Sequence, residues 1–91
     1  MSAVTIKLPT QLRDAVGGES IIQVEGINVA ECLEAAFAAH PELKDRISDG
    51  SGVRRFVNLY VGGEDVRFLD GLETPTPAGS EVTVLPAVAG G

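Results

Sequence analysis

The sequence is poor in the residues from which catalytic and metal sites are most often built. Its 91 residues contain one cysteine and one histidine, so these two residue types cannot supply a four-ligand zinc or iron–sulfur site. A single cysteine also excludes an intramolecular disulfide, which is typical of proteins from a reducing cytoplasm. We therefore expect a cytoplasmic protein that binds no metal or cofactor.

Long apolar runs and clusters of positive charge are absent from the sequence as well. No segment approaches the ~20 apolar residues of a membrane span, and the opening MSAVTIKLPT lacks the features of a secretory signal. Thirteen acidic and seven basic residues give a formal net charge of −6, and the basic residues are scattered apart from Arg54-Arg55. The sequence thus predicts neither membrane insertion nor binding to a nucleic-acid backbone.

What the sequence does contain is a regular pattern of strands around one helix. Hydrophobic residues make up 44% of the chain, as in a single globular domain. Apolar alternation and β-branched residues predict five strands, over residues 3–8, 20–25, 55–61, 65–68 and 81–85. The first two should form a hairpin, Gly62-Gly63 should form the turn between the third and fourth, and residues 48–52 and 73–79 should be loops.

The segment between Asn28 and Pro41 carries the clearest helix signal. Asn28 is a good N-cap, and Glu31 is placed to bond back to it as in a capping box. One continuous apolar stripe follows, formed by Val29, Cys32, Leu33, Ala36 and Phe37. Pro41 should end the helix, with a short helical turn over residues 41–47. Together these elements predict an α+β domain in which a mixed sheet of four to five strands packs on one main helix.

The last predicted strand is followed by an uncharged tail, Pro86-Ala87-Val88-Ala89-Gly90-Gly91. We expect residues 1–86 to form the domain and residues 87–91 to be flexible. Five residues span at most roughly 17 Å, which is long enough to enter a partner's active site. Because glycine has no Cβ, the two glycines can pass a narrow channel, and the Gly91 carboxylate is sterically open to attack.

The order of these elements and the ending LPAVAGG resemble the ubiquitin-like β-grasp sulfur carriers, the MoaD and ThiS families. Within that group, the segments RFVNLYV (55–61) and EDVRF (64–68), with the terminal PAVAGG, are similar to the CysO branch, which is used in cysteine biosynthesis. The resemblance covers nearly the whole chain. It implies a ubiquitin-like β-grasp fold and a carrier that is a substrate of partner enzymes, not an enzyme.

The resemblance also implies the chemistry of the tail. An E1-like adenylating enzyme of the MoeB/ThiF type would consume ATP to convert the Gly91 carboxylate into an acyl adenylate, with Ala87, Val88, Ala89 and Gly90 in the enzyme's channel. A sulfur donor would then displace AMP and leave a C-terminal thiocarboxylate (1-thioglycine). In the CysO-like case, a PLP-dependent cysteine synthase would take up the sulfur, and a zinc-dependent peptidase of the JAMM type would release the cysteine.

Four further residues are candidates for partner docking. If one alternating set of the 55–61 strand faces the helix, Phe56 and Tyr60 lie on the opposite face of the sheet. Together with Leu85 and Pro86 they would form an apolar docking patch. The alternative is that the N-terminal segment covers them.

The cysteine and the histidine are interpreted as structural. Cys32 lies on the apolar stripe of the helix, which favours a buried, inert thiol over a reactive one. His40 stands beside Pro41 and is interpreted as a helix-end residue, the alternative being a phosphoryl-accepting one.

Three other functions are compatible with the same tail. A MoaD-like small subunit of molybdopterin synthase and a ThiS-like sulfur donor in thiazole synthesis would differ only in who receives the sulfur. A ubiquitin-like protein modifier would share the activation step and end as an isopeptide on a lysine.

Overall fold

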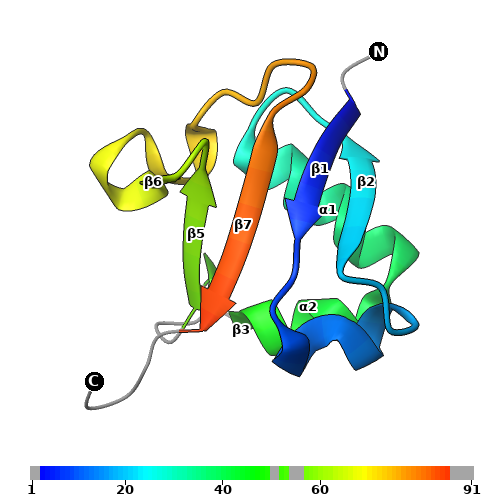
Figure 1. Cartoon of the computed structure of the whole chain (residues 1–91). Helices are drawn as coiled ribbons and strands as arrows, with labels where there is room; N and C mark the ends of the chain where they lie inside the picture. The colour runs from blue at the N-terminus through cyan, green and yellow to red at the C-terminus, as the bar shows by residue number, and fades with distance from the viewer. Residues whose placement is uncertain (1–2, 50–51, 54–56, 87–91) are drawn as a thin grey trace.

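A mixed five-stranded sheet forms the centre of the molecule in the computed structural model, which describes residues 3–49, 52–53 and 57–86 (Figure 1). The sheet is ordered β2-β1-β7-β5-β6, where β7 is parallel to β1 and antiparallel to β5. The first and last strands of the chain are thus neighbours at its middle. The strands are β1 (Ala3–Lys7), β2 (Ile21–Glu25), β5 (Val57–Val61), β6 (Glu64–Asp65) and β7 (Glu81–Pro86).

Helix α1 (Val29–Ala39) crosses behind the sheet, and α2 (Pro41–Ile47) follows it directly (Figure 1). The Asn28 side chain caps α1 by accepting a hydrogen bond from the Glu31 amide at 2.8 Å, as predicted. The Glu31 carboxylate bonds back one residue earlier than the predicted capping box requires. It accepts a hydrogen bond from the amide of Ile27, at 3.2 Å, in place of the amide of Asn28. Since a proline suits the first position of a helix, Pro41 both ends α1 and begins α2.

The core lies between the helices and one face of the sheet. Alternate residues of the two central strands are almost fully buried, as the predicted alternation requires: Val4, Ile6, Val82 and Val84. The helices supply the other half of the core with Val29, Cys32, Leu33, Ala36, Leu43 and Ile47. From β5, Leu59 is buried and Val57 and Val61 pack against the cluster, so the predicted inward face of this strand is confirmed.

Residues between the first two strands are more ordered than the sequence indicated. The segment Thr10–Val16 forms the 3-10 helix η1, which ends at Gly17 with a φ of 71°. That left-handed conformation is tolerated by glycine at little cost. The two strands nevertheless pair as the predicted antiparallel hairpin.

Two further predictions were wrong in detail. The predicted loop over residues 48–52 contains a small two-stranded ladder, β3 (Ser48–Asp49) with β4 (Gly52–Val53). The predicted strand over residues 65–68 pairs only at β6 and then turns into the 3-10 helix η2 (Val66–Phe68).

The cause of that early turn is the Asp65 side chain, which accepts a hydrogen bond from the Arg67 amide at 2.8 Å. Aspartate often bonds to a nearby backbone amide in this way and so competes with strand pairing. A second short 3-10 helix, η3 (Gly71–Glu73), follows before the chain returns to β7.

Candidate functional site

Strand β7 carries the chain from the core to the start of the predicted tail. It is paired on both sides, with β1 and with β5, and its Val82 and Val84 are buried. Pro86, the last described residue, pairs with Val57. The β1–β7 ladder ends at Thr83, so the point at which the tail begins is held by pairing with β5 alone. Gly91 and its four predecessors, Ala87, Val88, Ala89 and Gly90, lie outside the described residues.

The sheet face opposite α1 presents one continuous row of side chains across the strands. The pairing register places Ile21, Lys7, Thr83, Tyr60 and Asp65 side by side in this row. Leu85 lies one step further toward the end of β7, paired with Asn58. We call this surface the outer sheet face.

Two of the predicted docking residues meet on the outer sheet face. Tyr60 is half-buried and Leu85 is 42% exposed. The N-terminal segment from Ala3 onward forms a strand within the sheet, so it does not cover these residues. Phe56, like Arg54 and Arg55, lies outside the described residues, and Pro86 is placed only through its backbone pairing.

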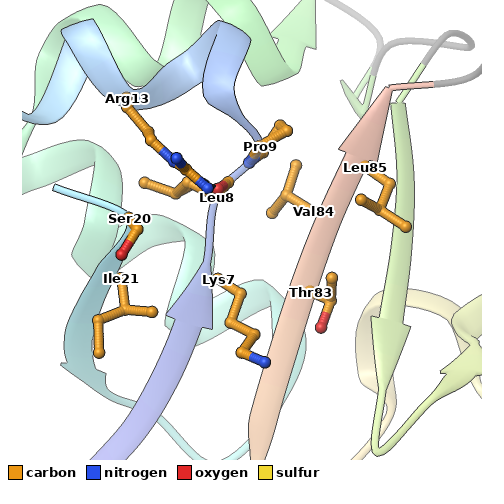
Figure 2. A pocket seen from close by; sticks show the side chains of 9 residues that line it. All are labelled: Lys7, Leu8, Pro9, Arg13, Ser20, Ile21, Thr83, Val84 and Leu85. Atoms are coloured by element: carbon orange, nitrogen blue, oxygen red, sulfur yellow. Dashed lines mark hydrogen bonds between the residues drawn. The ribbon is translucent and has the colours of Figure 1, made fainter. Parts of the chain in front are cut away.

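A cavity of about 340 Å³ opens on the outer sheet face next to the end of β7. Figure 2 shows its lining from three parts of the chain: Lys7, Leu8, Pro9 and Arg13; Ser20 and Ile21; and Thr83, Val84 and Leu85. The walls are mainly apolar, and two cationic side chains border them. Small-molecule and side-chain pockets commonly have this composition.

The two cations of the cavity are held differently. The Nε of Arg13 donates to the carbonyl oxygen of Leu8 at 3.2 Å, so the guanidinium is anchored by its inner edge. The Nζ of Lys7 lies 3.6 Å from the Oε1 of Glu81. This ion pair is exposed and so contributes little to stability. Neither residue could be placed here from sequence, because η1 and three separate strand ends must come together first.

A third cation, Arg67, is fixed near Tyr60 at the sheet edge. Its guanidinium contacts the Asp65 carboxylate, with an Nη2 to Oδ2 distance of 2.7 Å, and Nη2 also donates to the Asn58 side chain at 2.9 Å. Hydrogen bonds from the Arg67 side chain and amide lower the pKa of Asp65, and the same pairing raises the pKa of Arg67. Both groups are therefore charged at neutral pH.

Cys32 is fully buried, as the sequence predicted. Its Sγ lies 3.4 Å from the Thr76 hydroxyl, which donates to the carbonyl of Gly26 at 3.1 Å. A buried thiol in such a position is structural and not accessible to a partner. His40 lies between the two helices, where its amide donates to the carbonyl of Ala36, so its helix-end position is confirmed.

Two absences hold for the part of the chain that the structure describes. It contains no group of three or more histidine, cysteine, aspartate and glutamate side chains placed to hold a metal ion. None of its helices has the length and apolar character needed to cross a bilayer.

Known proteins resemble this chain over nearly its whole length. The ThiS family model matches residues 6–91. The sulfur carrier protein CysO of Mycobacterium tuberculosis is 41% identical over 91 residues, which cover 97% of this chain and 98% of CysO.

Solved structures resemble the fold equally well. One chain in the crystal structure of the BexX/CysO complex of Amycolatopsis orientalis matches with a TM-score of 0.89 and 42% identity, over 97% of this chain and 99% of that chain. The small archaeal modifier protein 1 of Methanosarcina acetivorans also has a TM-score of 0.89, with 30% identity over 100% of this chain and 98% of that one. The fold is thus the ubiquitin-like β-grasp, the likeness to CysO supports a sulfur-carrier role, and the chain belongs to the ThiS family.

Proposed function

We propose that this protein carries sulfur as a thiocarboxylate on Gly91 and delivers it for cysteine biosynthesis in the cytoplasm. The observation that carries the proposal is the position of β7. This central strand ends at Pro86, directly before the uncharged residues 87–91, and an apolar face with a cavity adjoins that end. The near full-length likeness to sulfur carriers supports the same conclusion.

The chemistry begins with activation, because a carboxylate has no leaving group. In the proposed sequence, an oxygen of the Gly91 carboxylate attacks the α-phosphorus of ATP, pyrophosphate leaves, and an acyl adenylate forms. A sulfide equivalent from a donor then attacks the acyl carbon and expels AMP. The resulting thiocarboxylate holds a nucleophilic sulfur on a tether of five residues, which raises its effective concentration in a partner's site.

The catalytic groups for these steps belong to partner enzymes. The proposed partners are an E1-like adenylating enzyme, a PLP-dependent cysteine synthase and a zinc-dependent peptidase of the JAMM type. What this chain supplies is a folded domain that the enzymes can recognise and a tail, Ala87, Val88, Ala89 and Gly90, that places Gly91 in their sites.

We place the docking of these partners on the outer sheet face. Tyr60 and Leu85 lie there together, and the cavity beside Leu85 offers apolar walls with Arg13 at its border. The outer sheet face adjoins the end of β7, from which the tail leads to Gly91, so it lies within reach of an enzyme that acts on Gly91. Burying an apolar side chain there would supply binding energy, while Arg13 would favour a carboxylate on the partner.

The proposal is tested by loading the protein in vitro. Incubation with the adenylating enzyme of the same organism, ATP and a sulfide source should replace one oxygen of the C-terminus by sulfur, as measured by intact-protein mass spectrometry. Deletion of Gly90 and Gly91 should abolish the change without altering the urea unfolding curve, because a glycine has no side chain to bury. An unmodified protein, with an adenylating enzyme that is active on another carrier, would refute the proposal.

A second candidate function is protein modification. The likeness to the small archaeal modifier protein 1 favours it, because activation at the terminal glycine would be shared. The two functions differ in the step that follows activation of Gly91. Lysine-linked conjugates that depend on Gly91, recovered from the native host, would support modification, whereas transfer of the sulfur to a cysteine synthase supports the carrier.

A further inference from the structure

The most exposed large apolar side chain among the described residues lies outside the outer sheet face. Phe68, the last residue of η2, is 85% exposed. Leu69 and Leu72 stand close to it in the chain and are 39% and 37% exposed. Single exposed apolar residues are ordinary, but three within five residues form a cluster. We call residues 64–73 the Phe68 loop.

The Phe68 loop is held rigidly although little of it is buried. Val66 is its one residue in the core cluster. Hydrogen bonds close its turns, from the Leu69 amide to the Val66 carbonyl at 2.9 Å and from the Asp70 amide to the Thr74 hydroxyl at 3.1 Å. These bonds constrain the backbone on either side of Phe68, which reduces the backbone entropy lost when a partner binds it.

The loop is also strongly acidic. Residues 64–73 contain four carboxylates and one guanidinium, so this segment carries −3 of the chain's formal charge of −6. Arg67 is paired with Asp65, and no cation among the described residues pairs with the carboxylates of Glu64, Asp70 or Glu73, which are all exposed. An apolar centre with an anionic rim is complementary to an apolar pocket bordered by lysine and arginine.

The loop continues the outer sheet face without a break. Asp65 pairs with Tyr60 in the sheet, and the Arg67 side chain crosses to Asn58, which itself pairs with Leu85. Figure 1 shows η2 projecting from the β5–β6 edge of the sheet. A partner that covers Tyr60 and Leu85 therefore reaches the Phe68 loop with an adjoining part of its surface.

We propose that the Phe68 loop is a second docking element, which the adenylating enzyme binds through an apolar pocket with a basic rim. This inference rests on the proposed function. The adenylating enzyme acts first, when Gly91 still ends in a carboxylate like that of every other protein. Beyond what the tail residues 87–90 provide in the channel, its selectivity must come from the folded domain, and the loop offers the most exposed apolar side chain among the described residues.

The test measures the KM for the carrier in ATP–pyrophosphate exchange by the adenylating enzyme of the same organism. Phe68→Ser should raise this KM by about 10- to 100-fold, because the burial of one phenyl ring is lost, and should leave kcat unchanged. Phe68→Leu should recover most of the affinity. Ile27→Ser is the matched control, since Ile27 is 66% exposed in the β2–α1 connection, and its KM should equal that of the wild type.

The acidic rim is tested by charge. Asp70→Asn with Glu73→Gln should raise the KM about threefold to tenfold and weaken its dependence on salt, because fewer charges are attracted to the basic rim. Glu34→Gln, an exposed carboxylate on α1, should change neither quantity.

The outcomes separate this inference from the proposed function. A wild-type chain that is not adenylated overturns both. If the wild type is adenylated and Phe68→Ser keeps the KM within twofold, the loop is not a docking element and the proposed function stands. A Phe68→Ser variant that changes only the sedimentation of the free carrier makes the loop a contact between copies and overturns the inference. Equal urea midpoints for the variants exclude misfolding as the cause.

Discussion

Replacing Gly26 by alanine should destabilise the fold strongly, although its backbone conformation is open to any residue. An alanine Cβ at this position would lie 2.8 Å from the Cys32 nitrogen, 2.9 Å from the Cys32 Sγ and 3.0 Å from the Glu31 carbonyl carbon. Contacts this short require a shift of several tenths of an ångström. Two of the three atoms belong to the backbone of α1, so rotating a side chain cannot relieve them.

The start of α1 has little freedom to shift. The Val29 amide donates to the Thr74 carbonyl at 3.1 Å, and the Thr76 amide donates to the Ile27 carbonyl at 3.0 Å. Overpacking of this kind costs about 1–3 kcal/mol, and a reduced entropy of the unfolded chain offsets it by only about 0.4–1 kcal/mol. We expect a net loss of about 1–2 kcal/mol, which for a domain of this size lowers the Tm by roughly 5–15 °C.

Urea unfolding followed by circular dichroism measures this loss. The control is Gly79→Ala, whose φ of 89° strains the alanine but whose Cβ has nothing within 4 Å. Combining Gly26→Ala with Cys32→Ala should recover only part of the loss, because it removes the sulfur and leaves the backbone contacts. Stability within about 0.5 kcal/mol of the wild type, or full rescue by the double variant, would show that backbone crowding is not the cause.

Two further predictions concern the thiol and the sheet edge. The Cys32 thiol should react with a thiol reagent only at the rate of unfolding, and fast labelling of the folded protein would contradict this expectation. Thr76→Val should lower the free energy of unfolding by about 1–3 kcal/mol, because it leaves the Gly26 carbonyl without its donor. Because Arg67 lowers the pKa of Asp65 in the folded state, their pairing stabilises the fold above about pH 4 and is lost as the pH falls through the lowered value. Asp65→Asn should thus flatten the acid limb of the stability–pH profile from urea titrations, and an unchanged limb would exclude the pairing as a contributor.

Much of the fold could be predicted from the sequence, because the apolar residues of its longest strands and its main helix recur with a clear period. The alternation in β1 and β7 and the stripe of α1 both proved to be core, since burial on one face leaves that pattern in the sequence. The errors fell in short segments such as residues 48–52 and 65–68. At residues 65–68 the side-chain hydrogen bond of Asp65 outweighs a weak strand preference, whereas at residues 48–52 two-residue strands are too short to show an alternating pattern.

By itself, the sequence determined the class of the domain and the chemistry that its tail invites. An apolar period, a capped helix and an uncharged ending with two glycines are local properties, and each is written in consecutive residues. Alternation also placed Tyr60 on the face opposite the helix, while leaving open what covers it.

Only the tertiary structure decided which surface surrounds the start of the tail. The cavity joins Lys7, Arg13, Ser20 and Leu85, and the crowding at Gly26 depends on a helix turn that packs over it. Both arise from the parallel pairing of β1 with β7 and the packing of α1 on the sheet, which bring together residues far apart in the chain. No local pattern encodes contacts between such distant segments, because they exist only once the sheet has formed.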